Sequence, residues 1–425
     1  MATYVFEEMQ DSDAVAFDGS TDRLFFNSAT VGTLGVVDHA GTSGPLGTTN
    51  ETITLTYGTI SHTFVAAELA DASTANNLIF VHGGDGDALA ITNDTTAAGF
   101  HGLDDADVGG HVAIYGLDGD STLVGTVGND TINGGAGDDS IVGSSSGVDA
   151  DGNFIENDFL QGGNGDDTII GGEGNDHIYG NLFSSTAGAA DGDDFIDAGN
   201  GNDYVNGNLG DDTVHGGIDN DRIYGGGGAD KLFGDDGNDY LQGNKGADTI
   251  DGGNGIDVIH GGADNDSLLG GNGNDQLFGD NGNDVIAGGN GYDQLWGGAG
   301  NDTFHFGTGE ADNANVHTAA TATNHGVVET INDFEDGKDV IHLTFAPAAD
   351  ANIHHTAAGA TFTDAAAAQD YAQTLLTGHG SDVAAITVGS DTYLFYDDTH
   401  TTGTINSAIK IVGVTDAAFT HTDFI

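Results

Sequence analysis

The chain has 425 residues, a formal net charge of −62 at pH 7 and no cysteine. This length predicts one to three domains, and the missing cysteines exclude disulfides, thiol chemistry and cysteine-ligated metals. The charge excludes nucleic acids and anionic membranes as electrostatic partners, because both would be repelled. Only 9 of the 68 acidic residues are glutamate, which leaves 59 aspartates beside 73 glycines, and this composition favours turns over helices.

Residues 1–106 are expected to form a small β domain. Within them, residues 52–65 (TITLTYGTISHTFV) alternate apolar and polar side chains and turn at Gly58, which predicts a β-hairpin. The opening residues contain no basic stretch, apolar core or cleavage site, so we expect no Sec signal peptide. The chain also has no run of about 18 apolar residues, so we expect no membrane-spanning helix.

Residues 125–305 repeat a nonapeptide, and residues 107–124 keep a weaker form of it that we expect to cap the array. The consensus copy begins with two glycine-like positions and has glycine at position four, aspartate at position six and a large apolar residue at position eight. Residues 162–170 (GGNGDDTII) and 270–278 (GGNGNDQLF) are clean copies. The position-six aspartates are the candidate metal ligands, and they are Asp130, Asp139, Asp158, Asp167, Asp176, Asp194, Asp203, Asp212, Asp221, Asp230, Asp239, Asp248, Asp257, Asp266, Asp275, Asp284, Asp293 and Asp302.

The spacing of the repeat predicts its structure. Six residues rich in Gly, Asn and Asp form a turn, and the next three form a short strand whose middle side chain points inward. Two repeats close one coil, and the coils stack about 4.8 Å apart as parallel strands. The stacked turns bring the aspartates together, so a hard cation must offset their repulsion. Calcium suits such a site better than magnesium, because it accepts about six to eight oxygen ligands in flexible geometry.

The nonapeptide resembles the calcium-binding repeat of RTX proteins, and the resemblance covers residues 125–305. It implies an all-β fold, a parallel β-roll (RTX β-solenoid), which would be flanked by small β-rich N- and C-terminal domains. It also implies that Ca²⁺ lies between turns two repeats apart, held by aspartate carboxylates and loop carbonyls. Glu156, Asp219 and Asp264 depart from the glycine at position four, and we expect the two aspartate copies to be only weakened.

Two insertions interrupt the repeat, one of 10 residues before Asp158 and one of 9 before Asp194. Each has about the length of one repeat, so we expect each to occupy a half-coil that lacks its aspartate. Both would then lie on the same side of the roll. One column of calcium ions would be unbroken from Asp139 to Asp302, the other interrupted near its start, and roughly 14 ions would bind.

Residues 306–425 are expected to form a β-rich C-terminal domain with a short helix over residues 364–376 and strands near residues 392–396 and 409–412. Residues 328–344 resemble the segment that follows RTX arrays. The segment from residue 391 onward resembles the ends of RTX proteins exported by type I secretion, and of calcium-dependent surface-layer proteins of Gram-negative bacteria. This resemblance implies that the secretion machinery is a partner and that the chain folds outside a Gram-negative cell.

Catalytic interpretations are weak. Residues 143–147 (GSSSG) match a serine-hydrolase elbow formally, with Ser145 as the nucleophile, but no buried strand precedes them. The HExxH motif of RTX metalloproteases does not occur. Asp149, Asp151 and Asn153 imitate half of an EF-hand loop and could bind one further cation. We therefore predict that the protein is not an enzyme.

The sequence favours an extracellular calcium-binding structural protein, most specifically a subunit of a self-assembling surface layer. The alternatives are an accessory module of an enzyme and an adhesin that binds polysaccharide at the cell surface. Outward-facing positions that recur every 18 residues place several aromatic residues on one face, and such patches usually mark contacts. The contact could be with the chain's own C-terminal domain, with another copy of the chain or with a sugar. The candidate interface residues are Tyr224, Tyr240, Phe278 and Trp296, and the expected partners are copies of the same chain and a surface polysaccharide.

Overall fold

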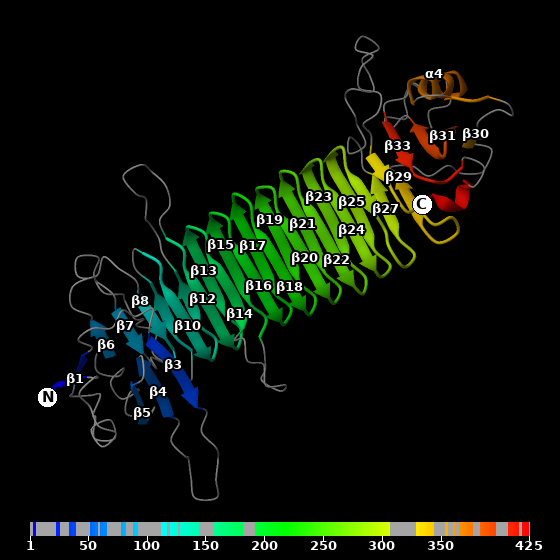
Figure 1. Cartoon of the computed structure of the whole chain (residues 1–425). Helices are drawn as coiled ribbons and strands as arrows, with labels where there is room; N and C mark the ends of the chain where they lie inside the picture. Colours follow the sequence, from blue (N-terminus) through cyan, green and yellow to red (C-terminus); the bar gives the residue numbers. More distant parts are fainter. Residues whose placement is uncertain are drawn as a thin grey trace, which may run out of the picture. The chain divides into compact units, whose positions relative to one another are not determined.

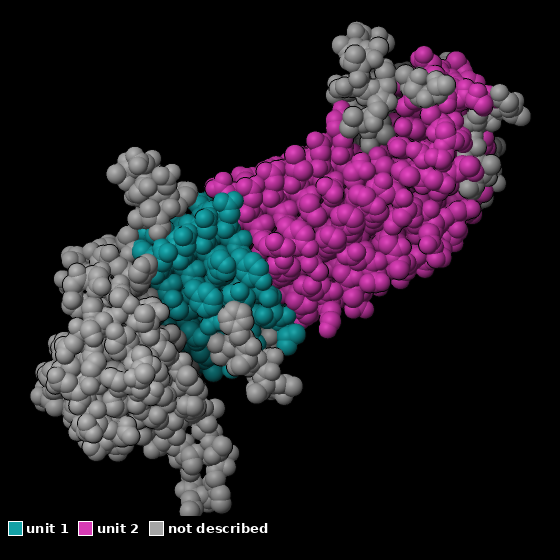
Figure 2. Space-filling model, in the orientation of Figure 1, with its two compact units in different colours: residues 1–214 teal, residues 215–425 magenta. Residues whose placement is uncertain are grey.

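The computed structural model of the chain divides into two compact units, residues 1–214 and 215–425, which are coloured separately in Figure 2. Among the described residues, no helix is long and apolar enough to cross a bilayer. Besides the strands up to residue 91, the structure describes residues 112–116, 120–125, 128–143, 156–181, 192–306, 329–343, 353–355, 360–362, 365–376, 383–396, 407–415 and 419–424.

The first unit begins with short β-strands whose backbones pair in small groups. Strands β1 and β2 are parallel, β3, β4 and β5 form an antiparallel sheet, and β6 pairs with β7. The pairing of β4 with β5 confirms the hairpin predicted around Gly58. The bounds are β1 (Thr3–Val5), β2 (Arg23–Phe25), β3 (Leu34–His39), β4 (Thr52–Tyr57), β5 (Ile60–Val65), β6 (Leu78–Val81) and β7 (Ala88–Ile91).

The rest of the first unit is a parallel β-roll whose successive strands alternate between two sheets (Figure 1). The first sheet also receives β7, which pairs with β8 in parallel. One sheet contains β8 (Val112–Tyr115), β10 (Thr131–Ala136), β12 (Phe159–Asn164), β14 (His177–Asn181) and β16 (Tyr204–Leu209). The other contains β9 (Thr122–Val124), β11 (Ser140–Val142), β13 (Thr168–Glu173) and β15 (Phe195–Asn200).

The second unit contains a two-sheet roll of the same kind, and β17 (Thr213–Ile218) spans the boundary between the two units in the sequence. Its first sheet contains β18 (Arg222–Gly227), β20 (Tyr240–Lys245), β22 (Val258–Ala263), β24 (Gln276–Asn281), β26 (Gln294–Trp296) and β28 (Glu329–Ile331). Its second sheet contains β19 (Lys231–Asp236), β21 (Thr249–Asn254), β23 (Ser267–Gly273), β25 (Val285–Gly291), β27 (Thr303–Phe306) and β29 (Val340–Leu343). The two sheets therefore extend past residue 305, where the repeat motif ends.

The core of the roll is one column of aliphatic side chains per sheet. Every position-eight residue is at most 2% exposed, and each lies opposite its equivalent one coil away, as Leu241 does to Ile259. Burial of one such side chain contributes about 1.5 to 3 kcal/mol. The column consists of Ile132, Ile141, Leu160, Ile169, Ile178, Ile196, Val205, Val214, Ile223, Leu232, Leu241, Ile250, Ile259, Leu268, Leu277, Ile286, Leu295 and Phe304, and Ile114 and Leu123 of the expected capping coils are buried in the same way.

The two insertions do not form half-coils, so that prediction is wrong. Ile132 pairs with Leu160 and Ile141 pairs with Ile169, so neighbouring strands in both sheets are separated in sequence by the 10 inserted residues in addition to the usual 18. Across the second insertion, β13 pairs with β15 and β14 with β16. Each insertion is therefore a loop between consecutive strands, and neither aspartate column in this unit is interrupted. Most of the inserted residues, including Ser145, Asp149, Asp151 and Asn153, lie outside the described part of the chain.

The C-terminal part of the second unit packs one helix on a small sheet. The helix α4 (Ala365–Leu376) confirms the predicted one, and its Ala368, Ala372 and Leu376 pack against Ile386 and Phe395. Strand β33 also pairs in parallel with β28, which joins this sheet to the end of the roll. The elements are β30 (Ile353–His355), β31 (Val383–Val388), β32 (Asp391–Tyr396), β33 (Ser407–Ile411) and a 3-10 turn, η5 (His421–Asp423).

Position four of the repeat needs glycine because the coils stack closely there. Gly255 has a φ of 142°, and a side chain at that residue would overlap the carbonyl group of Gly237 one coil earlier. Gly337 is a matched control, since it has a φ of 78° but no atom within 4 Å of the point where a side-chain methyl group would lie. We expect Gly337→Ala to cost about 1 to 2 kcal/mol through backbone strain alone. Gly255→Ala should cost clearly more, and urea unfolding in calcium measures both.

Equal losses of stability in the two variants would contradict this account. The aspartates that replace glycine at position four are compatible with it, because Asp219 and Asp264 have φ angles of 79° and 82°. Aspartate tolerates the left-handed region better than most residues.

Candidate metal sites

All eighteen predicted aspartates are buried at the same point of their turns, with exposed fractions of 0 to 3%. Each one directly precedes a strand of the roll, as Asp239 precedes β20 and Asp257 precedes β22. An ionised carboxylate in such a place is strongly destabilising unless a positive charge or hydrogen-bond donors compensate it. The partners of the two carboxylate oxygens therefore decide what the site can bind.

The first oxygen, Oδ1, is satisfied within the roll. Along the repeats, the backbone N–H of one aspartate donates to Oδ1 of the aspartate one coil further on, as Asp239 does to Asp257 at 2.8 Å. Six steps of this kind occur within residues 1–214 and eight within residues 215–425, at 2.7 to 3.0 Å. The aspartates thus form ladders along the roll, and each ladder runs next to one sheet.

The second oxygen, Oδ2, faces backbone oxygen atoms. A side chain on Gly243 would collide with Oδ2 of Asp248 and with the carbonyl oxygen of Gly261 in the next coil, and the same arrangement recurs along the roll. For at least eleven aspartates this oxygen is buried and accepts no hydrogen bond: Asp139, Asp158, Asp167, Asp176, Asp239, Asp257, Asp266, Asp275, Asp284, Asp293 and Asp302. A buried carboxylate oxygen among carbonyl oxygens matches the ligand set that Ca²⁺ prefers.

The side chains do not converge as in a zinc site. Within the described residues, no three acidic or histidine side chains form a group able to hold a metal ion by themselves. Each step offers two carboxylates, such as those of Asp257 and Asp275, together with backbone carbonyls. Calcium accepts this mixture, whereas zinc and other transition metals require nitrogen or sulfur ligands or a denser set of side chains.

Burial raises the pKa of these carboxyls far above the ordinary aspartate value of 3.8. The loss of hydration is the largest cause, and neighbouring carboxylates add to it. The pKa rises to about 9 for Asp158, about 8 for Asp167 and about 7 for Asp239 and Asp275. Without metal, carboxyl groups with such a raised pKa bind protons at neutral pH, because a buried negative charge is unfavourable. A bound divalent cation stabilises the ionised form, so the protons are no longer needed.

Two acidic residues beyond the nonapeptide copies, Glu329 and Asp339, continue the ladders, and a third, Glu156, lies beside one of them; sequence analysis assigned none of the three as a ligand. Glu156 is fully buried beside Asp158 and Asp176, neither of its oxygens accepts a hydrogen bond, and its charge raises the pKa of both aspartates. Glu329 and Asp339 lie in the strands' register one coil beyond Asp293 and Asp302. The sequences Glu-Thr-Ile and Asp-Val-Ile at residues 329–331 and 339–341 keep positions six to eight of the motif, and this was the available signal.

The candidate interface residues form one row on the first sheet of the second unit. The ring centroids of Tyr224 and Tyr240 are 5.9 Å apart, and His260 continues the row to Phe278 and Trp296. All five side chains are half-buried. In the first unit, Phe159, Tyr179 and Tyr204 form a similar group with centroids 5.7 Å apart, which sequence analysis did not single out.

The buried aspartate ladders and the two-sheet coil define a calcium-binding parallel β-roll. A profile of the RTX calcium-binding nonapeptide repeat, four copies long, matches residues 115–146, 154–186, 189–214, 206–241, 215–250, 242–277, 251–286 and 278–310. These residues are RTX calcium-binding repeats, as the motif predicted.

No curated protein matches the chain. A similar solved structure is the solution structure of the AlgE6R3 subunit from the Azotobacter vinelandii mannuronan C5-epimerase. It is 24% identical to this chain, and the match covers 41% of this chain and 80% of that chain with a TM-score of 0.28.

Proposed function

We propose that this protein is a non-catalytic structural protein of the cell exterior, a subunit of a self-assembling surface layer whose roll folds when calcium binds. The observation that supports it is the aromatic row Tyr224, Tyr240, His260, Phe278 and Trp296. The apolar column between the sheets forms the core of the roll, and the aromatic row lies outside that column. Large aromatic side chains on a surface usually mark a contact with protein.

The geometry of the row favours protein over sugar as its partner. The rings of His260 and Phe278 are 4.5 Å apart and nearly parallel, and those of Phe278 and Trp296 are 4.3 Å apart at 12°. Because these rings stack on one another, a neighbouring ring covers at least one face of each. A sugar stacks on a ring face, whereas the apolar surface of another subunit packs against edges equally well. The polysaccharide-binding adhesin is therefore the second candidate.

RTX repeats are typical of secreted bacterial proteins, and this supports an extracellular location. The proposal adds that type I secretion machinery exports the chain from a Gram-negative cell before the roll forms. Calcium is scarce in the cytosol and abundant outside, and extracellular modules bind it at about 10⁻⁴ to 10⁻³ M. Folding would then be delayed until export, and a surface polysaccharide could anchor the layer.

Electron microscopy and sedimentation of the purified chain test the proposal. With millimolar calcium we expect ordered assemblies, and with the same concentration of magnesium we expect none. A chain that gains its full β content in calcium but sediments as a monomer at every concentration would overturn the surface-layer role. Binding of a polysaccharide by that monomer would favour the adhesin.

The aromatic row gives a direct mutational prediction. Replacement of Trp296 and Tyr224 by serine should weaken assembly about tenfold or more, because aromatic anchors dominate the energy of protein contacts. Phe233→Ser is the matched control, since Phe233 stacks on His215 on the second sheet, outside the row. Sedimentation measures assembly, and circular dichroism checks that calcium still folds each variant. Equal weakening by the control, or none by the double variant, would remove the row from the interface.

A further inference from the structure

The last coil of the roll is built from residues that lie outside the repeat motif. The N–H of Thr330 donates to the carbonyl of Asp293 at 3.0 Å, and the N–H of Val340 donates to that of Asp302 at 2.8 Å. Ordinary coils have the same bonds, for example from His177 to Asp158. Glu329 and Asp339 thus occupy position six, one on each ladder.

Glu329 has the features of a ladder member with an unused ligand. Its Oε1 accepts the N–H of Asp293 at 3.2 Å, which is the role of Oδ1 elsewhere. Its side chain is 1% exposed, and its Oε2 accepts no hydrogen bond. Oδ2 of Asp293 is also buried and accepts no hydrogen bond. The final step of this ladder therefore has two buried carboxylate oxygens that need a positive partner.

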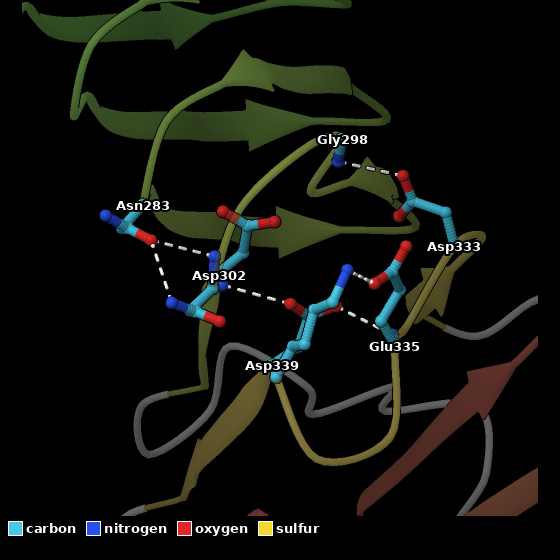
Figure 3. A network of polar contacts seen from close by, with 8 residues as sticks. Asn283, Gly298, Asp302, Asp333, Glu335 and Asp339 are labelled. Carbon is cyan, nitrogen blue, oxygen red and sulfur yellow. Dashed lines mark hydrogen bonds and ion pairs between the residues drawn. The ribbon is translucent and has the colours of Figure 1, made fainter.

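Asp339 ends the other ladder differently. Its Oδ1 accepts the N–H of Asp302 at 3.0 Å and its Oδ2 accepts the N–H of Glu335 at 2.7 Å, so both oxygens have donors (Figure 3). In the same turn, Asp333 accepts the N–H groups of Gly297 and Gly298 at 2.8 and 2.9 Å. This turn covers the end of the ladder with hydrogen bonds, and each oxygen of Asp339 accepts one of them.

We propose that the two ladders end in different ways: Glu329 completes a terminal calcium site with Asp293, whereas Asp339 is a hydrogen-bonded cap that does not ligate metal. This inference rests on the calcium sites being the aspartate steps described above. Glutamate is one methylene longer than aspartate and is a common calcium ligand, so it can replace the position-six residue where the chain re-enters the roll. The segment after the repeats is thereby part of the metal-binding array.

The only tryptophan of the chain makes the site testable, because Trp296 follows Asp293 by three residues. Terbium(III) prefers oxygen ligands as calcium does, and it emits when a nearby excited tryptophan transfers energy to it. We therefore expect Glu329→Gln to lose a large part of the tryptophan-sensitised terbium emission and one bound ion per chain. Asp339→Asn is the matched control, and it should keep the emission and the ion while lowering stability. Asp293→Asn should lose more emission than Glu329→Gln.

Circular dichroism of the same samples separates the possible failures. If calcium does not fold the wild-type chain and terbium does not emit, the calcium sites themselves are wrong. If the wild type folds and emits but Glu329→Gln is indistinguishable from it, or Asp339→Asn loses as much emission, only the terminal-site inference is overturned. Should Glu329→Gln not fold, Glu329→Asp decides the question. That variant keeps the charge on a shorter side chain, so weaker terbium binding supports the inference and unchanged binding overturns it.

Discussion

In a calcium chelator at neutral pH, the purified chain is expected to lose the strands of its roll, and millimolar calcium is expected to restore them. Each repeat fixes nine residues but buries only one large apolar side chain at position eight, so the core of the roll is thin. Its buried aspartates oppose folding further when no cation is bound, because they repel one another and lose hydration. Calcium must supply the missing stability.

Circular dichroism during a calcium titration measures this transition. A pair of adjacent aspartates provides the control: Asp167 is buried with an unpartnered Oδ2, whereas Asp166 beside it is exposed. Asp167→Asn should raise the calcium concentration at the midpoint several-fold, and Asp166→Asn should leave it nearly unchanged. Full β content in the chelator would show that the roll does not need the metal.

The regular part of the roll was predictable from the sequence because each structural role falls on one position of the repeat. Ile250 at position eight is buried, and Asp248 at position six lies in the ladder, for the same reason as in every other copy. The insertions were not predictable from their lengths. A segment of 9 or 10 residues fits a half-coil or a loop equally well, and only the pairing of β11 with β13 and of β13 with β15 decides for loops.

The end of the array was missed because residues 307–328, which do not carry the repeat, separate β27 from β28 in the sequence. Asp293 and Glu329 are 36 residues apart, twice the ordinary step, so a search at fixed spacing does not join them. The motif is also altered there, since glutamate replaces aspartate and glycine is missing from positions one, two and four. Long-range strand pairing, rather than local preference, places Glu329 in the ladder.

The second large effect is that acid should partly replace calcium. In the unfolded chain, Asp139, Asp239 and Asp275 titrate near the ordinary value of 3.8, whereas in the metal-free fold the pKa of each rises to about 7 through burial. Between these two values the folded chain binds more protons than the unfolded chain, so its stability falls as the pH rises. The stability that these protonated carboxyl groups give the metal-free fold is therefore fully present below pH 4 and is lost by about pH 7. This is the reverse of ordinary acid denaturation.

We therefore expect the chain in chelator to be unfolded at pH 7.5 and to gain β structure as the pH falls toward 5, with a slope of up to about 1.4 kcal/mol per pH unit for each such carboxyl. Circular dichroism measures the gain, and sedimentation at each pH excludes aggregation near the sequence pI of about 4.1. In saturating calcium the trend should invert, because protons then compete with the metal for the same oxygens. A metal-free chain that stays disordered down to pH 5, or is most ordered at high pH, would show that the carboxyls titrate alike in both states. The buried ladder would then contribute nothing to the requirement for calcium.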